Sequence, residues 1–290
     1  MESIRSTLAR PVLVGVERVR RDPDAAVAYD AAVPFPHTVI SELLTSEAFH
    51  RVAAEFPLID DPGWNGYLHV NETKYANPDP ATWPAALRDL ARELCSDDFV
   101  AFLGELTGID GLIADWSMDG GGLHQTPRGG HLNVHTDFTA HHVHSSWRRR
   151  INVLLYLNEE WKPEWGGALE LWPADMSARA CAVDPTGNTM LVFTTSGSSF
   201  HGHPDPLRCP EGVARRSLAL YYFTDEGQPA RHATNYRARP GDGAKAVAIW
   251  VDRFALRVYD VLKRRFKLSD TFVQAVLTRV HRLRPRGLRR

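Results

Sequence analysis

A succession of short β-rich segments between residues 111 and 226 constrains the fold of this chain more than any other feature. Each segment is rich in β-branched and aromatic residues, and glycine, proline or asparagine turns separate it from the next. The segments are GLIADW, GHLNVHTDF, RINVLLYLN, GALELW, TMLVFTT, SSFHG and RRSLALYYFT. Because no helical pattern intervenes, these strands are expected to pair antiparallel, in a sandwich or a double-stranded β-helix (jelly roll).

The region before these segments has a helical pattern. Apolar residues recur at three- and four-residue spacing in 41–56 and in 84–108, where Ser41 and Ser46 are candidate helix caps. Residues 61–84 are rich in turn formers and aromatic residues, and we expect them to form a loop that is either functional or mobile.

A helical pattern returns after the β-rich region. Residues 246–266 carry an apolar stripe, Ser269 is a candidate cap for a last helix, and an arginine-rich tail follows. The expected class is therefore α+β with a mainly β core and flanking N- and C-terminal helices. We expect one domain over 1–290, made of mostly helical support (1–110), a jelly-roll core (111–228), and C-terminal helices with a basic tail (229–290).

Composition narrows the classes of partner and location. With 290 residues, 43% of them hydrophobic, the chain can bury a sizeable core, and its net charge of −1 predicts no nucleic-acid partner. No apolar run approaches the roughly 20 residues that cross a bilayer, and charges interrupt the start of the chain, so we expect a cytoplasmic protein without membrane contact. The three cysteines lack CxxC spacing and predict neither disulfides nor a zinc knuckle. The sequence leaves the oligomeric state open.

Five histidines occur in HLNVHTDFTAHHVHSSW, residues 131–147. In a strand, alternate side chains share a face, which would group His131, Asn133, His135 and Asp137. His135 and Asp137 offer a neutral nitrogen and an anionic oxygen, a pair suited to Fe(II). A second imidazole must come from elsewhere, and SSFHGHP offers His201 and His203. Histidines in the polar loop that follows Asp137 are more often solvated than ligating.

The order of HTDF, YLNEEW, WGGALELW, SFHGHPDPL and RRSLALYYFT resembles that of the 2-oxoglutarate/Fe(II)-dependent oxygenases, in their bacterial prolyl-hydroxylase-like branch. The resemblance extends to VPFPHTVISELLTSEAFHRVAAEFP and GGGLHQTPRGGHLNVHTDF, and so covers most of the chain. It implies His135, Asp137 and His201 as iron ligands, with His203 as the second choice in place of His201. It also implies Fe(II), 2-oxoglutarate as co-substrate, dioxygen, and ascorbate as a reductant.

The co-substrate needs a cation for the carboxylate that does not reach the metal, preferably a guanidinium. Arg215 and Ser217 lie two apart on one expected strand, so both can face the interior while Arg216 faces outward. The resemblance to the oxygenase family implies the same two residues, because they match the Arg-x-Ser motif of that family. The further candidates for contacts with the keto-acid are Tyr156, Asn152 and Gln125.

The resemblance implies oxidative decarboxylation coupled to attack on a C–H bond, with hydroxylation, ring closure or desaturation as outcomes. We expect the substrate to be a polar small molecule of a bacterial biosynthetic pathway, because 61–84 and 138–147 supply polar and aromatic side chains suited to closing a pocket. Lys74, Asn133 and His141 are the candidate substrate contacts. The first alternative is a hydroxylase of prolyl or other protein residues. A cupin-like metal-binding protein without oxygenase activity is the second, although it would not need Arg215 and Ser217.

Overall fold

The computed structural model describes residues 13–228, 234–247 and 249. The helices are α1 (Val14–Arg20), α2 (Ala25–Ala31), α3 (Ser46–Ala54), α4 (Ala85–Leu94) and α5 (Asp97–Thr107), with short 3-10 turns η1 (Pro80–Thr82) and η2 (Pro163–Trp165). The strands are β1 (His37–Ile40), β2 (Asn65–His69), β3 (Glu72–Asn77), β4 (Ile113–Ala114), β5 (Gly122–Pro127), β6 (His131–Thr136), β7 (Trp147–Tyr156), β8 (Leu169–Trp172), β9 (Cys181–Val183), β10 (Thr189–Thr194), β11 (Phe200–His203), β12 (Ala214–Asp225) and β13 (Asn235–Tyr236).

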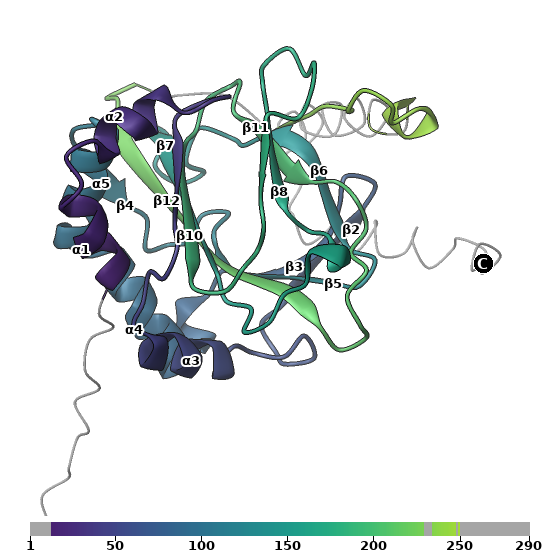
Figure 1. The fold of residues 1–290 in the computed structure, drawn as a ribbon, viewed down its shortest axis with the longest axis horizontal. Coiled ribbons are helices and arrows are strands. Elements are labelled where there is room, and N and C mark those ends of the chain that lie inside the picture. Colours follow the sequence, from purple (N-terminus) through teal and green to yellow (C-terminus); the bar gives the residue numbers. More distant parts are fainter. Residues whose placement is uncertain (1–12, 229–233, 248, 250–290) are drawn as a thin grey trace, which may run out of the picture.

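All these strands belong to one antiparallel sheet that curls into a double-stranded β-helix (Figure 1). The strand order is β1-β10-β7-β12-β5-β3-β6-β11-β8-β9, with β13 on β6, β2 on β3 and β4 on β12. Each of the seven segments predicted as β-rich contains a strand, so the predicted jelly roll with N-terminal helices is confirmed.

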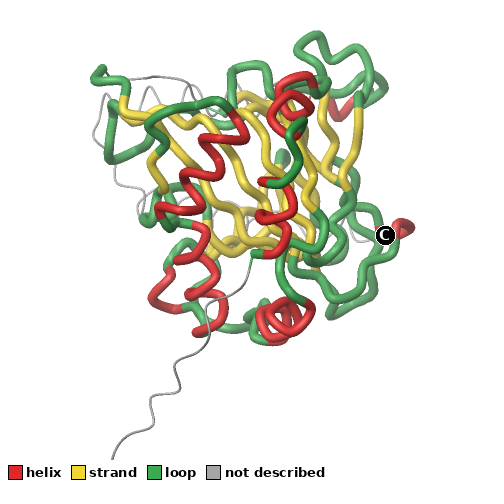
Figure 2. The backbone as a smooth tube through the Cα atoms, turned by 60° about the vertical axis from the view of Figure 1, so that its left-hand side comes forward, coloured by secondary structure: helices red, strands yellow, loops and turns green. Residues whose placement is uncertain are grey.

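Side chains along the central strands alternate between the face of the sheet that the helices cover and the face that lines the interior. On β7, Ile151, Val153 and Leu155 are buried with the helices in the main apolar core, whereas Asn152 and Leu154 line a cavity on the opposite face. β12 divides its side chains in the same way. Figure 2 shows the helices crossing the outer face of the sheet. Period-two alternation therefore assigns one face to the core and the other to a site.

The N-terminal helices differ in detail from the sequence prediction. The pattern over 84–108 forms two helices, because Ser96 accepts a hydrogen bond from the Phe99 amide and begins α5. α3 begins after Thr45, whose hydroxyl accepts from the Ala48 amide, so neither Ser41 nor Ser46 is its cap. Each capping side chain satisfies an amide that the first turn leaves free.

The expected loop over 61–84 is instead largely a hairpin of β2 and β3. β3 lies between β5 and β6, and β1 also joins the sheet, so the first 110 residues contribute strands as well as helices. The sequence of β3, ETKYAN, is too polar to be recognised as a strand. It is polar because part of it faces the cavity inside the sheet and not an apolar core. Of the predicted helix over 246–266, the structure describes residues 246, 247 and 249, which are helical. The rest of this helix, the Ser269 cap and the basic tail lie outside the described residues. Among the described helices, none has both the length and the apolarity needed to cross a bilayer.

Candidate metal and co-substrate site

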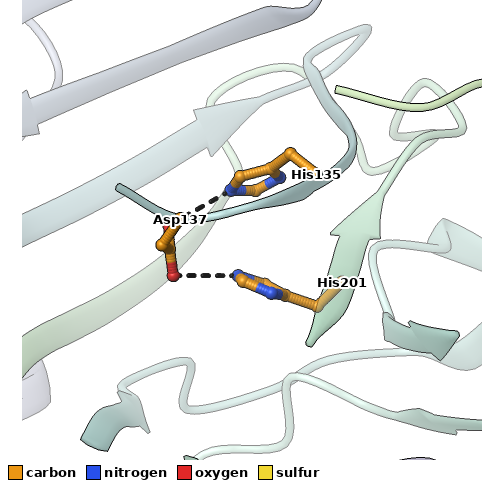
Figure 3. A group of neighbouring side chains, drawn as sticks. All are labelled: His135, Asp137 and His201. Atoms are coloured by element: carbon orange, nitrogen blue, oxygen red, sulfur yellow. Dashed lines mark ion pairs between the residues drawn. The ribbon is translucent and has the colours of Figure 1, made fainter. Parts of the chain in front are cut away.

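Two neighbouring strands bring His135, Asp137 and His201 together (Figure 3). His135 on β6 pairs directly with His201 on β11, and Asp137 follows the end of β6. Asp137 Oδ1 lies 3.4 Å from His135 Nε2, and Oδ2 lies 3.5 Å from His201 Nε2. One donor atom from each of the three residues lies within 4.8 Å of the others, as a shared metal ion would require.

Backbone carbonyls orient both imidazoles. His135 Nδ1 lies 2.9 Å from the Asn133 carbonyl oxygen, and His201 Nδ1 lies 3.0 Å from that of Ser199. A ring that donates from Nδ1 presents its Nε2 lone pair to the centre, which is the tautomer a metal ligand needs. Burial lowers the pKa of His201 to about 4, which keeps this imidazole neutral at pH 7.

The carboxylate of Asp137 is held by two neighbours on β7. Asn152 Nδ2 donates to Oδ2, and Arg149 Nη1 lies 3.4 Å from the same oxygen. Burial opposes ionisation, yet His201 and Arg149 outweigh it and hold the pKa of Asp137 well below its usual range. The group is therefore a buried anion beside two imidazole nitrogens. Asn152 was predicted as a co-substrate contact; it lines the cavity and also positions this carboxylate.

Arg149 is a site residue that strand alternation does not predict. Tyr222 pairs with Ile151 and Phe223 with Arg149, so β7 has one extra residue in this interval. The irregularity turns Arg149 toward Asp137, where its guanidinium lies 3.9 Å from the Phe138 ring centre and 3.6 Å from that of Tyr221. A β-bulge changes which face a side chain occupies, and the sequence RRRIN does not reveal it.

A second bulge corrects the predicted face of β6. His201 pairs with His135 but His203 pairs with Leu132, which gives β6 three residues for two on β11. Leu132 consequently lines the cavity, while Asn133 does not. The Asn133 amide donates to the Val70 carbonyl and to Asn71. Asn133 was expected to share the ligand face and contact substrate, and the extra residue places it elsewhere.

The other end of the cavity has a buried arginine. Arg215 donates from Nε to the Gly167 carbonyl at 2.8 Å and from Nη2 to the Tyr156 hydroxyl at 3.2 Å. Arg215 and Ser217 both line the cavity, whereas Arg216 lies over the Phe56 ring outside it. The predicted strand phase is therefore correct.

The neighbouring strand β5 places other side chains in the cavity than that of Gln125, which was predicted. Thr126 pairs with Arg215 and His124 with Ser217, and both side chains line the cavity. Gln125 lies between them in the sequence and pairs with Arg216, so it faces away, contrary to expectation. Thr126 and His124 were missed because the strand GLHQTP, without an apolar alternation, gives no sign of which side faces inward.

Lys74 lies in the cavity wall, as expected for a substrate contact. Its Nζ lies 3.0 Å from Glu72 Oε2, and Glu72 Oε1 lies 2.9 Å from His69 Nε2. Burial lowers the pKa of Lys74, but Glu72 outweighs this and raises it. The lysine is thus a fixed cation on β3.

His141 does not reach the cavity, contrary to its predicted role as a substrate contact. Its side chain is fully buried, with Nε2 3.5 Å from Asp115 Oδ2. Nδ1 accepts hydrogen bonds from the amides of Val143 and His144. These contacts tie down the loop before β7, so they give His141 a structural position.

A family model described as the 2OG-Fe(II) oxygenase superfamily matches residues 121–223. This segment includes His135, Asp137, His201 and Arg215. The chain is similar to this superfamily over about a third of its length, which supports an Fe(II)- and 2-oxoglutarate-dependent oxygenase. A comparison with curated proteins finds no match.

Solved structures with similar folds include a prolyl-4-hydroxylase from Pseudomonas putida, at 21% identity over 69% of this chain and 98% of that chain, with a TM-score of 0.50. A prolyl hydroxylase from Trichoplax adhaerens, in complex with a hypoxia inducible factor peptide fragment, has 16% identity over 74% and 92%, with a TM-score of 0.54. HygX from Streptomyces hygroscopicus has 15% identity over 70% and 87%, with a TM-score of 0.45. At these identities the likeness to the two prolyl hydroxylases is one of fold.

Proposed function

We propose that His135, Asp137 and His201 hold the Fe(II) ion of this oxygenase. Two neutral nitrogens and one anionic oxygen match the two-histidine, one-carboxylate set that binds non-haem Fe(II) and leaves positions open. The observation that supports this assignment most strongly is that this set and the Arg215–Ser217 pair face the same cavity. An enzyme that binds a metal ion and a dicarboxylate side by side needs both the metal-ligating set and the arginine–serine pair.

In this proposal the distal carboxylate of 2-oxoglutarate binds to Arg215 and Ser217. Arg215 is fixed through Gly167 and Tyr156, so its remaining N–H groups are oriented before the co-substrate arrives. The Tyr156 hydroxyl accepts from Arg215 and retains a hydrogen to donate. Tyr156 is therefore suited to bind the same carboxylate.

With Fe(II) and dioxygen bound, the centre supplies oxidative decarboxylation of 2-oxoglutarate to succinate, coupled to attack on a substrate C–H bond. The protein's part is to hold geometry. Asn152 and Arg149 fix Asp137, while the carbonyls of Asn133 and Ser199 fix the two imidazoles. Buried walls exclude bulk water from the reacting groups.

We further propose that the substrate is a polar small molecule, which is hydroxylated, cyclised or desaturated. The polar character of the cavity wall near β3 and β5 supports this, since Lys74, His124 and Thr126 lie there. A prolyl or other protein residue is the second candidate. The Pseudomonas and Trichoplax proteins of similar fold are prolyl hydroxylases, which favours this candidate. Their low sequence identity to this chain supports only a shared fold.

Succinate release from the purified full-length protein tests both proposals. With Fe(II), 2-oxoglutarate and ascorbate, we expect polar metabolites to stimulate release more than a proline-rich peptide library does. Lys74→Ala should lower the stimulated rate, while Lys162→Ala, at an exposed lysine outside the cavity, should not. Stimulation by peptides alone, with no effect of Lys74→Ala, would favour the protein substrate. Metal binding without any response to 2-oxoglutarate would instead favour a cupin-like protein.

A further inference from the structure

His203 lies in the site without a role in the proposed metal centre. It follows His201 by two residues on β11, lines the same cavity and is 3% exposed. It is not a member of the three-residue group that can share a metal ion. Its Nδ1 is buried and has no hydrogen-bond partner among the described residues.

The surroundings of His203 are cationic. Arg215 and Lys74 are its charged neighbours. An imidazole has at least one N–H to donate in either protonation state. Arginine and lysine side chains only donate, so neither can accept a hydrogen bond from the ring.

The proposed co-substrate would supply the acceptor that is missing. A carboxylate has about four lone-pair positions for hydrogen bonds. Arg215 already uses its Nε hydrogen on Gly167 and one Nη2 hydrogen on Tyr156, which limits the directions in which it can donate. Ser217 adds one hydroxyl. A carboxylate beside Arg215 therefore has room for another donor, and an unpaired buried N–H is unfavourable.

We propose that His203 donates a hydrogen bond to the distal carboxylate of 2-oxoglutarate, beside Arg215. This inference rests on the proposed co-substrate site and adds to it an imidazole donor from the strand that also carries His201. His203 then acts on the affinity for the co-substrate and not on the affinity for the metal.

Calorimetric titration of Zn(II)-loaded full-length protein measures this contribution without turnover. His203→Leu removes the donor and keeps an apolar side chain of related size, so we expect it to weaken 2-oxoglutarate binding about tenfold. His203→Asn keeps a donor near the Nδ1 position and should recover part of the affinity. His131→Leu is the control, because His131 lies outside the cavity with Nε2 3.2 Å from the Val70 carbonyl oxygen.

A second ligand separates this role from a general disturbance of the site. 2-Oxopentanoate has the same five-carbon chain and keto-acid end but lacks the distal carboxylate. We expect His203→Leu to leave its affinity unchanged, and to raise the KM for 2-oxoglutarate without lowering kcat at saturation. Equal 2-oxoglutarate affinities of wild type and His203→Leu would overturn the inference, as would equal weakening of both keto-acids or loss of zinc. Failure of the wild-type protein to bind 2-oxoglutarate would instead overturn the co-substrate site itself.

Discussion

Asp137 is the residue that joins the two histidines of the proposed metal centre. It lies between His135 and His201, and its charge is balanced by a guanidinium from β7. Replacing it would leave Arg149 and Asn152 without their common acceptor. The loss would therefore disturb these two side chains as well as remove a ligand.

We expect His135→Ala, Asp137→Ala and His201→Ala each to abolish iron-dependent turnover by removing a ligand. His203→Ala should retain the metal, because His203 lies outside the ligand group. Metal content after equilibrium dialysis against Fe(II) under nitrogen distinguishes the two classes. Loss of metal in His203→Ala with retention in His201→Ala would reverse the assignment.

The two adjacent arginines on β12 provide a matched pair. Arg215→Ala should weaken 2-oxoglutarate binding roughly 10²-fold, because a buried charged hydrogen-bond partner is lost. Arg216→Ala should have little effect, since this side chain packs on Phe56 outside the cavity. Titration of both variants with 2-oxoglutarate measures the difference. Equal losses of 2-oxoglutarate affinity in the two variants would show that the inward direction of Arg215 does not decide which arginine binds the co-substrate.

At the scale of elements, the hairpin of β2 and β3 supplies a buried ion pair to the barrel wall. Burial would raise the pKa of Glu72, but Lys74 and His69 together lower it below its usual value. Folded protein therefore releases the Glu72 proton more readily than unfolded protein does. The stabilisation is present above the unfolded pKa and is lost as the pH falls toward the folded pKa.

Glu72→Gln should consequently destabilise the protein by about 3 kcal/mol at pH 7, because Lys74 loses its buried partner. The difference from wild type should shrink as the pH is lowered below about 4.5, because Glu72 is then protonated in the unfolded chain while it stays ionised in the folded protein. Urea unfolding at several pH values measures this difference. Glu164→Gln, at an exposed residue of η2, is the control. A difference that grows at low pH would contradict the prediction.

At the scale of the whole molecule, the site joins strands that are distant in the sequence. Ligands that bind only the folded chain must therefore stabilise all of it. With Zn(II) bound, 2-oxoglutarate at 100 times its Kd should add about 2.7 kcal/mol and raise the Tm by roughly 5 °C. Asp137→Ala should show little of this rise under the same conditions. An equal rise in that variant would place the binding site elsewhere.

The sequence alone determined those features that depend on local pattern. Short β-rich segments predicted the jelly roll, and the two-residue spacing predicted that Arg215, not Arg216, faces inward. The segment around His135 and Asp137 and the later His201 were identified through their resemblance to a family. The structure brings these three side chains together.

Only the tertiary structure decided which other side chains face the cavity. A bulge on β6 places Leu132 in the cavity wall in place of Asn133, and another bulge on β7 turns Arg149 toward Asp137. Neither bulge follows from the local sequence, because each arises where a strand pairs with a partner far along the chain. Long-range pairing also inserts β3 between β5 and β6, which places Lys74 in the cavity wall. The alternation of side chains is set by the local sequence, whereas the partners of a strand are fixed by the closed sheet as a whole.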